Sequence, residues 1–237
     1  MKVKELIAGL VAACLMSGLA PGAQAEAPAA PVVVELFTSQ GCSSCPPADE
    51  LLNQLAERSD ILPLALHVDY WDYIGWADSF ARPEHTKRQK AYAHVAGSRT
   101  IYTPQMVVGG QEQIIGARPM EVAEAVMRHL RTGTTVLLSL EQRDGELRLT
   151  APALAEAGRY SVQLVRFMPE ETVVIERGEN AGRTMTYSNI VTDWQMLDEW
   201  TGVAPLDMAL PAGGEGRAAV IVQQNRIGPI VGALRLP

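Results

Sequence analysis

The feature that most constrains the fold is a pair of cysteines three residues apart, set between an apolar run and the start of a helix. The run Val32–Phe37 predicts a buried strand, and polar Thr38–Gly41 follow it before Cys42. After Cys45, the pair Pro46–Pro47 and then leucines at helical spacing predict an amphipathic helix. The sequence therefore predicts strand, turn, Cys-x-x-Cys and helix, in that order.

The two cysteines are the candidate catalytic residues. The positive end of a helix dipole and unpaired backbone amides stabilise a thiolate, which is the form of cysteine that attacks disulfides. We therefore expect Cys42 to be the nucleophile and Cys45 to resolve the mixed disulfide. A zinc site needs four ligands, and the chain has no second cysteine pair. A structural bridge across so short a loop would stabilise the fold little, so a redox-active disulfide is favoured over a structural bridge or a metal ligand.

Residues 1–25 have the pattern of a secretory signal peptide. Two lysines precede the apolar region Leu6–Ala20, and Ala23–Ala25 forms a small-x-small cleavage site. We expect cleavage after Ala25 and an Ala/Pro linker at residues 26–31. The mature protein is then expected to be periplasmic or secreted.

Cys14 offers an alternative, because Val11–Cys14 loosely resembles the lipobox of bacterial lipoproteins. In that case the protein would be anchored at Cys14. Otherwise Cys14 is lost with the signal peptide. Export then leaves Cys42 and Cys45 in an oxidising compartment, where an exposed pair at this spacing is redox-active or bridged.

The charge balance narrows the class of partner. The chain has 20 basic and 27 acidic side chains, and loss of two lysines and one glutamate with the signal peptide leaves 18 and 26, a net charge of −8. That balance argues against nucleic acid and anionic membranes as partners. We expect no transmembrane span in the mature chain, no dissociable cofactor, and a protein or small-molecule thiol or disulfide as the substrate.

Strands and helices alternate through residues 32–131. The next apolar run, Ile61–Val68, predicts a second buried strand, joined through the helix as a parallel crossover. An insertion then precedes a hairpin and a last helix. The predicted elements are an aromatic segment at Tyr70–Phe80, a helix from Pro83 to about Ala96, strands at Gln105–Val108 and Gln113–Ile115, and a helix opened by Pro119.

From residue 134 to residue 237 the pattern changes to short strands separated by turns. Strands at this density predict a mainly-β, sandwich-like C-terminal domain. The segment Asp193–Trp200 could instead form a helical turn. The candidate strands are Val136–Leu140, Leu147–Thr150, Tyr160–Phe167, Thr172–Glu176, Thr184–Val191, Val203–Leu210, Arg217–Gln224 and Ile230–Leu234.

Thr103 and Pro104 are the candidate substrate-binding residues. They come after the crossover and directly before the strand at Gln105–Val108. The order of the elements resembles that of the thioredoxin fold, in which a proline directly before this strand is cis. The resemblance therefore implies a cis bond here, which would turn the chain sharply and leave the preceding backbone able to pair with an extended substrate. The alternative is an ordinary trans proline at the first residue of a strand.

His67 and Asp69 are a candidate metal site, because they point to the same side of a strand end. Together with Cys42 and Cys45, His67 could bind copper or zinc. The favoured interpretation is that His67 and Asp69 are hydrogen-bonded residues at the end of the strand.

The remaining polar and aromatic residues receive structural interpretations. Histidines in helical stretches are expected at the surface. The aromatic segment is expected to pack rather than to form a substrate-facing wall. The histidines are His85, His94 and His129, the aromatic residues are Tyr70, Trp71, Tyr73 and Trp76, and structural roles also go to Asn180, Arg183, Tyr187 and Trp194.

Residues 32–131 resemble a thioredoxin-like domain with a helical insertion. The resemblance rests on Gly41–Pro46 (GCSSCP) and on Thr103–Gln105 (TPQ), which resembles the glutaredoxin form of the proline loop. The whole chain is similar to a bacterial family of secreted thioredoxin-like proteins of unknown function. Segments that carry this similarity are Leu36–Asp49, His67–Asp72 and Gly178–Arg183.

The chain departs from the thioredoxin pattern at several positions. Gln40–Gly41 precede the first cysteine, Ser43–Ser44 stand between the two cysteines, and no basic residue lies in the motif. Thiolate stabilisation must therefore come from the helix end and the serine hydroxyls. If Cys42 is the N-cap, the doubled proline removes two amides from the first turn.

The resemblance implies an exported thiol-disulfide oxidoreductase but gives no substrate. One alternative is a periplasmic copper-binding protein that uses Cys42, Cys45 and His67. The other is a non-catalytic binding module whose disulfide stays closed. The redox interpretation requires that Pro104 lie against the two cysteines and that their sulfur atoms be within reach of solvent.

Overall fold

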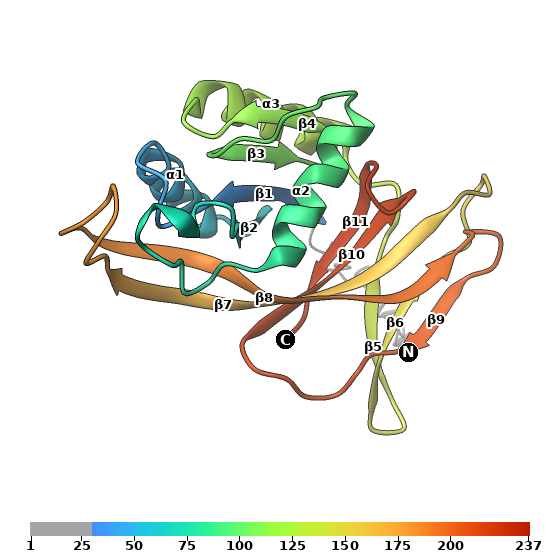
Figure 1. Ribbon diagram of the computed structural model, residues 1–237. Coiled ribbons are helices and arrows are strands. Elements are labelled where there is room, and N and C mark those ends of the chain that lie inside the picture. The colour runs from blue at the N-terminus through green and yellow to red at the C-terminus, as the bar shows by residue number, and fades with distance from the viewer. Residues whose placement is uncertain (1–29) are drawn as a thin grey trace, which may run out of the picture.

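The computed structural model describes residues 30–237 (Figure 1). The predicted signal peptide, Cys14 and most of the predicted linker lie outside the described residues. Within the described part, no helix is both long enough and apolar enough to cross a membrane.

Eight strands form one large sheet in the order β11-β10-β7-β8-β2-β1-β3-β4. The central strand β1 pairs with β2 in parallel and with β3 in antiparallel orientation. Every residue of β1 and β2 is buried, which explains their nearly continuous apolar sequences. The strands are β1 (Val32–Thr38), β2 (Ile61–His67), β3 (Gln105–Val108), β4 (Glu112–Ile115), β7 (Tyr160–Val174), β8 (Thr184–Trp200), β10 (Arg217–Gln224) and β11 (Ile230–Arg235).

Alternate side chains of β1 face two different cores, because successive residues of a strand point to opposite faces. Val34 and Leu36 pack with helices α1 and α3. Val33 and Phe37 pack instead against Tyr92 of α2 and against side chains of β7, β8 and β10. These three strands come on the other side of β2 in the strand order of the same sheet. The helices are α1 (Pro46–Ala56), α2 (Pro83–Val95) and α3 (Pro119–Thr132), with a short 3-10 turn η1 (Asp72–Ile74).

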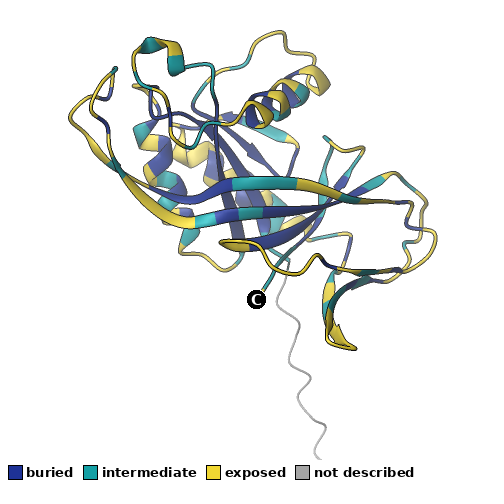
Figure 2. Cartoon of the chain, turned by 60° about the horizontal axis from the view of Figure 1, so that its bottom comes forward, coloured by how far each residue is buried: buried dark blue, intermediate teal, exposed yellow. Residues whose placement is uncertain are grey.

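A second sheet of three strands packs against the part of the large sheet that is formed by the C-terminal strands β7, β8, β10 and β11. Its order is β5-β6-β9, with β5 (Ser139–Arg143), β6 (Glu146–Ala151) and β9 (Leu206–Ala209). Leu149 and Leu206 pack with Val162, Leu164 and Val220 of the large sheet in a third core. Figure 2 shows the central strands buried, whereas most residues of β5 are exposed. The protein is thus mixed α/β with a β-rich C-terminal part, as the sequence predicts.

The large sheet continues across the change of pattern near residue 134. Strand β8 pairs in parallel with β2, with Ala65 opposite Ile190. Beside this pair, Asn189 Nδ2 donates to the Pro63 carbonyl at 2.9 Å. Four C-terminal strands, β7, β8, β10 and β11, therefore extend the sheet of the first half and share its second core, whereas β5, β6 and β9 form the second sheet.

Two strand expectations are wrong in detail. Strand β8 runs without a break to Trp200, so Asp193–Trp200 is not a helical turn. The expected strands Tyr160–Phe167 and Thr172–Glu176 are one strand, β7, which pairs with β8 along its length. The register of this pairing shifts at two places along β7. Figure 1 shows β7 and β8 as a long ribbon whose closed end lies beside α1.

A buried ion pair in the N-terminal half also contacts strands of the C-terminal half. Glu35 of β1 is fully buried, and the Arg88 guanidinium of α2 donates to both of its carboxylate oxygens. Arg88 also donates to Tyr92 Oη at 3.0 Å and to Gln223 Oε1 of β10 at 3.1 Å. Its guanidinium lies 3.8 Å from the ring centroid of Trp194 in β8. One cation thus binds residues from α2, β1, β8 and β10.

Candidate functional site

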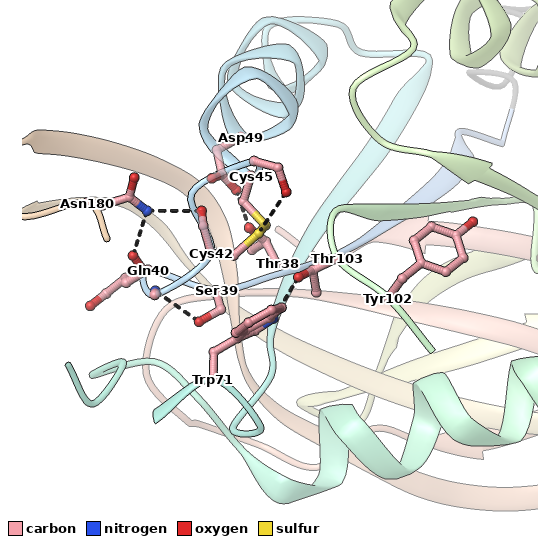
Figure 3. The surroundings of a disulfide bond; sticks show 12 residues. Thr38, Ser39, Gln40, Cys42, Cys45, Asp49, Trp71, Tyr102, Thr103 and Asn180 are labelled. Carbon is pink, nitrogen blue, oxygen red and sulfur yellow. Dashed lines mark hydrogen bonds between the residues drawn. A yellow bond between two sulfur atoms is a disulfide. The ribbon is translucent and has the colours of Figure 1, made fainter. Parts of the chain in front are cut away.

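The two cysteines form a disulfide in the turn that follows β1. The Cα atoms of Cys42 and Cys45 are 5.4 Å apart. The Cys42 amide donates to the Ser39 carbonyl at 3.1 Å, and the Cys45 amide donates to the Cys42 carbonyl at 3.2 Å. The Ser39 hydroxyl accepts from the Gly41 amide at 3.1 Å, so side chain and backbone together fix the turn (Figure 3).

Helix α1 begins one turn later than a Cys42 N-cap would require. Its N-cap is Cys45, with prolines at the next two positions. The amides of Ala48 and Asp49 both donate to the Cys45 carbonyl, at 2.8 and 3.1 Å. Because prolines lack an N–H group, the expected set of free helix-end amides near Cys42 is missing. The polar group that does lie near its sulfur is the Ser44 hydroxyl, with Oγ 3.4 Å from Cys42 Sγ.

Both cysteines are buried, whereas the sequence leads us to expect a pair within reach of solvent. Cys42 has 2% of its surface exposed and Cys45 has none. The insertion packs against the residue before Cys42: a Cβ on Gly41 would be 3.4 Å from Trp71 Cβ and 3.3 Å from Ile74 Cδ1. Within the pair, only Cys42 offers any surface to a reagent.

Thr103 lies beside the disulfide, and Pro104 follows it in the chain (Figure 3). Their peptide bond is cis, as the sequence predicts. The Trp71 indole N–H donates to Thr103 Oγ1 at 2.7 Å, which ties the proline loop to the insertion. A Cβ on Gly116 would lie 3.1 Å from both Pro104 Cβ and Ala48 Cβ, so Pro104 is close to the first turn of α1. Within residues 30–237, neither the N–H nor the carbonyl of Thr103 has a hydrogen-bond partner.

Gln40, two residues before Cys42, is fully buried and anchored by the insertion. Its amide donates to Asp78 Oδ2 at 2.8 Å, and its side-chain amide donates to Ser79 Oγ at 3.2 Å. Its Oε1 accepts from the Trp76 indole N–H at 2.7 Å. The expectation that aromatic residues of this segment pack is met by Trp71 and Trp76, whereas Tyr73 is 81% exposed.

Asn180, from the closed end of the β7–β8 ribbon, also binds the cysteine turn. Its Nδ2 donates to the carbonyls of Gln40 at 2.9 Å and Cys42 at 3.0 Å (Figure 3). A structural role is expected for Asn180, but its contact with the cysteine turn does not follow from the sequence. The available signal was a turn motif, Gly178–Asn180, with nothing to connect it to a cysteine nearly 140 residues earlier in the chain.

Three buried titratable groups, Asp49, His67 and Asp78, lie close enough to one another for their charges to interact. Asp49 Oδ1 accepts from Thr38 Oγ1 at 2.7 Å, while its Oδ2 is buried and has no partner among the described residues. Burial raises the pKa of Asp49 to about 7, against the opposing effects of His67 and the Thr38 hydrogen bond. Burial also acts to raise the pKa of Asp78, but His67 and the amides of Gln40 and Phe80 outweigh it and hold that pKa below its usual value.

His67 is held in place by neighbouring side chains. Its Nδ1 donates to Asp78 Oδ2 at 2.7 Å, and its ring packs edge-on against Phe80 and Tyr187 at 5.2 and 4.8 Å. Asp69 accepts from Thr86 Oγ1 at 2.6 Å. With the two cysteines joined in a disulfide, no three His, Cys, Asp or Glu side chains within residues 30–237 are grouped so that they could hold a metal ion.

The expectation of surface histidines is wrong for one of the three. His85 is 3% exposed, and its Nδ1 donates to the His67 carbonyl at 2.8 Å. Burial lowers the pKa of His85 to about 4. His94 is exposed, and His129 Nε2 lies 3.2 Å from Glu112 Oε1 near the surface.

Known proteins resemble this chain in sequence and in fold. The profile of a family described as "Protein of unknown function (DUF1223)" matches residues 33–223. A crystal structure of a protein from Agrobacterium tumefaciens is 35% identical with a TM-score of 0.76, and the match covers 89% of this chain and 96% of that one. HBP35 of Porphyromonas gingivalis is 13% identical with a TM-score of 0.60, over 88% of this chain and 75% of that one, which is a likeness of fold alone. No curated protein matches the chain. Because the profile spans most of its length, the protein belongs to this family of proteins of unknown function, DUF1223.

Proposed function

We propose that this protein is an exported thiol-disulfide oxidoreductase with a thioredoxin-like fold. The observation that carries the proposal is the Cys42–Cys45 disulfide at the head of α1, in which only Cys42 has exposed surface. A further support is the order of elements, in which β1, α1 and β2 form a parallel crossover and β3 and β4 follow as a hairpin before α3. Export is supported by the leader-like residues 1–25 and agrees with a compartment in which disulfides persist.

The proposed reaction transfers two electrons between the cysteine pair and a substrate disulfide. The Cys42 thiolate attacks one substrate sulfur, forming a mixed disulfide and releasing the first substrate thiolate. The Cys45 thiol loses its proton and attacks Cys42 Sγ, which closes the Cys42–Cys45 disulfide and releases the second thiolate. The substrate is reduced by two electrons, the dithiol is oxidised by two, and the protons pass to the released thiolates. The reverse sequence oxidises a substrate dithiol.

Thr103 and Pro104 are proposed to hold the substrate beside the cysteines. The support is the backbone of Thr103, next to the disulfide, whose N–H and carbonyl have no hydrogen-bond partner in the described part of the chain. An extended substrate segment can pair with these groups as an added strand would. Trp71, through its bond to Thr103 Oγ1, keeps this loop in place.

The proposal is tested by disulfide exchange in redox buffers. The protein, expressed from the full chain, is titrated with mixtures of reduced and oxidised glutathione, and the thiols are counted by alkylation. We expect reversible titration and disulfide exchange with a model disulfide, lost in Cys42→Ser. Cys45→Ser should instead accumulate the mixed disulfide at Cys42, because the resolving thiol is gone. A wild-type disulfide that stays closed across the titration would contradict the proposal.

Burial of both cysteines favours a second candidate, a binding module whose disulfide stays closed. With Cys42 at 2% exposure and Cys45 fully buried, a bulky reagent has little access to either sulfur. The same titration separates the two functions. A closed disulfide that resists glutathione but reacts after unfolding in urea would support the binding module.

Ser44→Ala is expected to slow the reaction of reduced Cys42 with iodoacetamide by about two- to fivefold at pH 7. The reason is that the Ser44 hydroxyl lies 3.4 Å from Cys42 Sγ and can donate to a thiolate there. The rate is followed by mass spectrometry in the Cys45→Ser background, so that one thiol reacts. Ser43→Ala is the matched control, because Ser43 is also exposed and next to Cys42 but makes no hydrogen bond to the sulfur. Equal rates for the two variants would contradict the role of Ser44.

A further inference from the structure

The closed end of the β7–β8 ribbon reaches the cysteine turn through one side chain. Asn180 is 1% exposed, and the two hydrogens of its Nδ2 are directed at two backbone carbonyls, those of Gln40 and Cys42. These carbonyls flank Gly41, so the two bonds span the bend that leads into the disulfide. The Cys42 carbonyl is shared, because it also accepts from the Cys45 amide at 3.2 Å. A single amide therefore contacts the backbone on both sides of the bend.

The ribbon end is itself firmly built. The Ile175 amide donates to the Arg183 carbonyl at 2.9 Å, the Gly182 amide donates to the Ile175 carbonyl at 2.7 Å, and the Arg183 amide donates to the Asn180 carbonyl at 3.2 Å. Ile175 is fully buried. Gly178 has a φ of +78° and lies against the insertion, where a Cβ would be 3.2 Å from Trp76 Cβ. Asn180 therefore lies in a turn that is held by backbone hydrogen bonds.

We propose that Asn180 is a positioning residue that holds the cysteine turn in the geometry in which Cys42 and Cys45 join. This inference rests on the proposed thiol-disulfide activity. A disulfide closes readily when its two thiols are held within reach, because the reaction is then effectively unimolecular. Asn180 acts on the backbone of Cys42 and does not touch a sulfur atom. It therefore sets how strongly the closed form is favoured over the dithiol.

The test compares two buried asparagines that differ in what they hold. Asn180→Asp replaces the donor by a carboxylate facing two carbonyls, and Asn180→Ala removes the amide without adding charge. Asn189→Asp is the matched control, because Asn189 is 6% exposed and its Nδ2 also donates to a buried carbonyl, that of Pro63, away from the cysteines. The full-length protein and each variant are equilibrated with glutathione buffers, and circular dichroism verifies that they are folded.

We expect the equilibrium constant between disulfide and dithiol to shift about tenfold toward the dithiol in Asn180→Asp and about threefold in Asn180→Ala. Asn189→Asp should match the wild type. Wild-type equilibration with unchanged constants in both Asn180 variants would overturn the role of Asn180 while leaving the redox function in place. An equal shift in Asn189→Asp, or failure of Asn180→Ala to fold, would also overturn it, because the residue would then be a general structural one. If the wild type does not equilibrate at all, the redox function itself fails.

Discussion

Arg88→Ala is expected to lower the free energy of unfolding by about 3–5 kcal/mol, because it leaves the carboxylate of Glu35 buried without its cation. Glu35 is fully buried in the central strand, and Arg88 is the residue that donates to both of its oxygens. The substitution also removes the donors to Tyr92 and Gln223 and the contact with Trp194. A loss of this size is a large part of the total stability of a typical domain, about 5–15 kcal/mol.

Urea denaturation followed by tryptophan fluorescence measures this loss. Arg128→Ala is the matched control, because Arg128 also pairs with a glutamate, Glu112, but with side chains that are 49% and 35% exposed. An exposed pair of this kind contributes at most about 1 kcal/mol. The double variant Glu35→Leu with Arg88→Met should regain stability relative to Arg88→Ala, since no buried charge remains. Equal losses in Arg88→Ala and Arg128→Ala would contradict the importance of the buried pair.

Asp49→Asn is expected to stabilise the oxidised protein above neutral pH, by roughly 2–4 kcal/mol. Burial raises the pKa of Asp49 to about 7 from 3.8. Between these two pH values, Asp49 binds a proton in the folded protein but not in the unfolded chain. The free energy of unfolding is therefore not reduced by Asp49 below pH 3.8, and it falls as the pH rises through 7, where the buried carboxyl must ionise. Asparagine does not titrate and keeps an oxygen for the Thr38 hydroxyl, so this loss should disappear.

The measurement is the free energy of unfolding of wild type and Asp49→Asn at pH 4.5 and pH 8.5. The difference between the two proteins should be small at the lower pH and largest at the higher one. Asp60→Asn is the control, because Asp60 is exposed and the pKa of its carboxyl is lowered by its hydrogen bond to Arg58. A wild-type curve parallel to that of Asp49→Asn would show that Asp49 ionises with its ordinary pKa.

The parts of the fold that follow from local sequence were predictable. The run Val32–Phe37 predicts a strand buried on both faces, and Pro46–Pro47 predicts the first turn of α1. The run Ile61–Val68 predicts a strand that pairs in parallel with β1. For these three segments the pattern and its structural cause lie within a few residues of each other. The cis bond before Pro104 was predictable only from the resemblance to the thioredoxin fold, because a proline directly before a strand is ordinarily trans.

The parts that depend on distant contacts were not predictable. Nothing in the sequence around Asn180 distinguishes an amide bound to the Cys42 carbonyl from one that faces solvent. His85 occupies a polar helix, and its burial follows from its bond to the His67 carbonyl, which is a tertiary contact. The N-cap at Cys45 rather than Cys42 depends on which carbonyl the amides of α1 select, and a proline pair is compatible with both.

The pairing of β8 with β2 has a consequence for how this family can be cut or recombined. If the chain were ended after α3, one side of β2 would lose its neighbour, and the N–H and carbonyl groups there would be open to pairing with other molecules. The apolar side chains of β1 that face β7 and β10 would also be uncovered. We therefore expect that the N-terminal half, cut after α3, would not fold as a separate module.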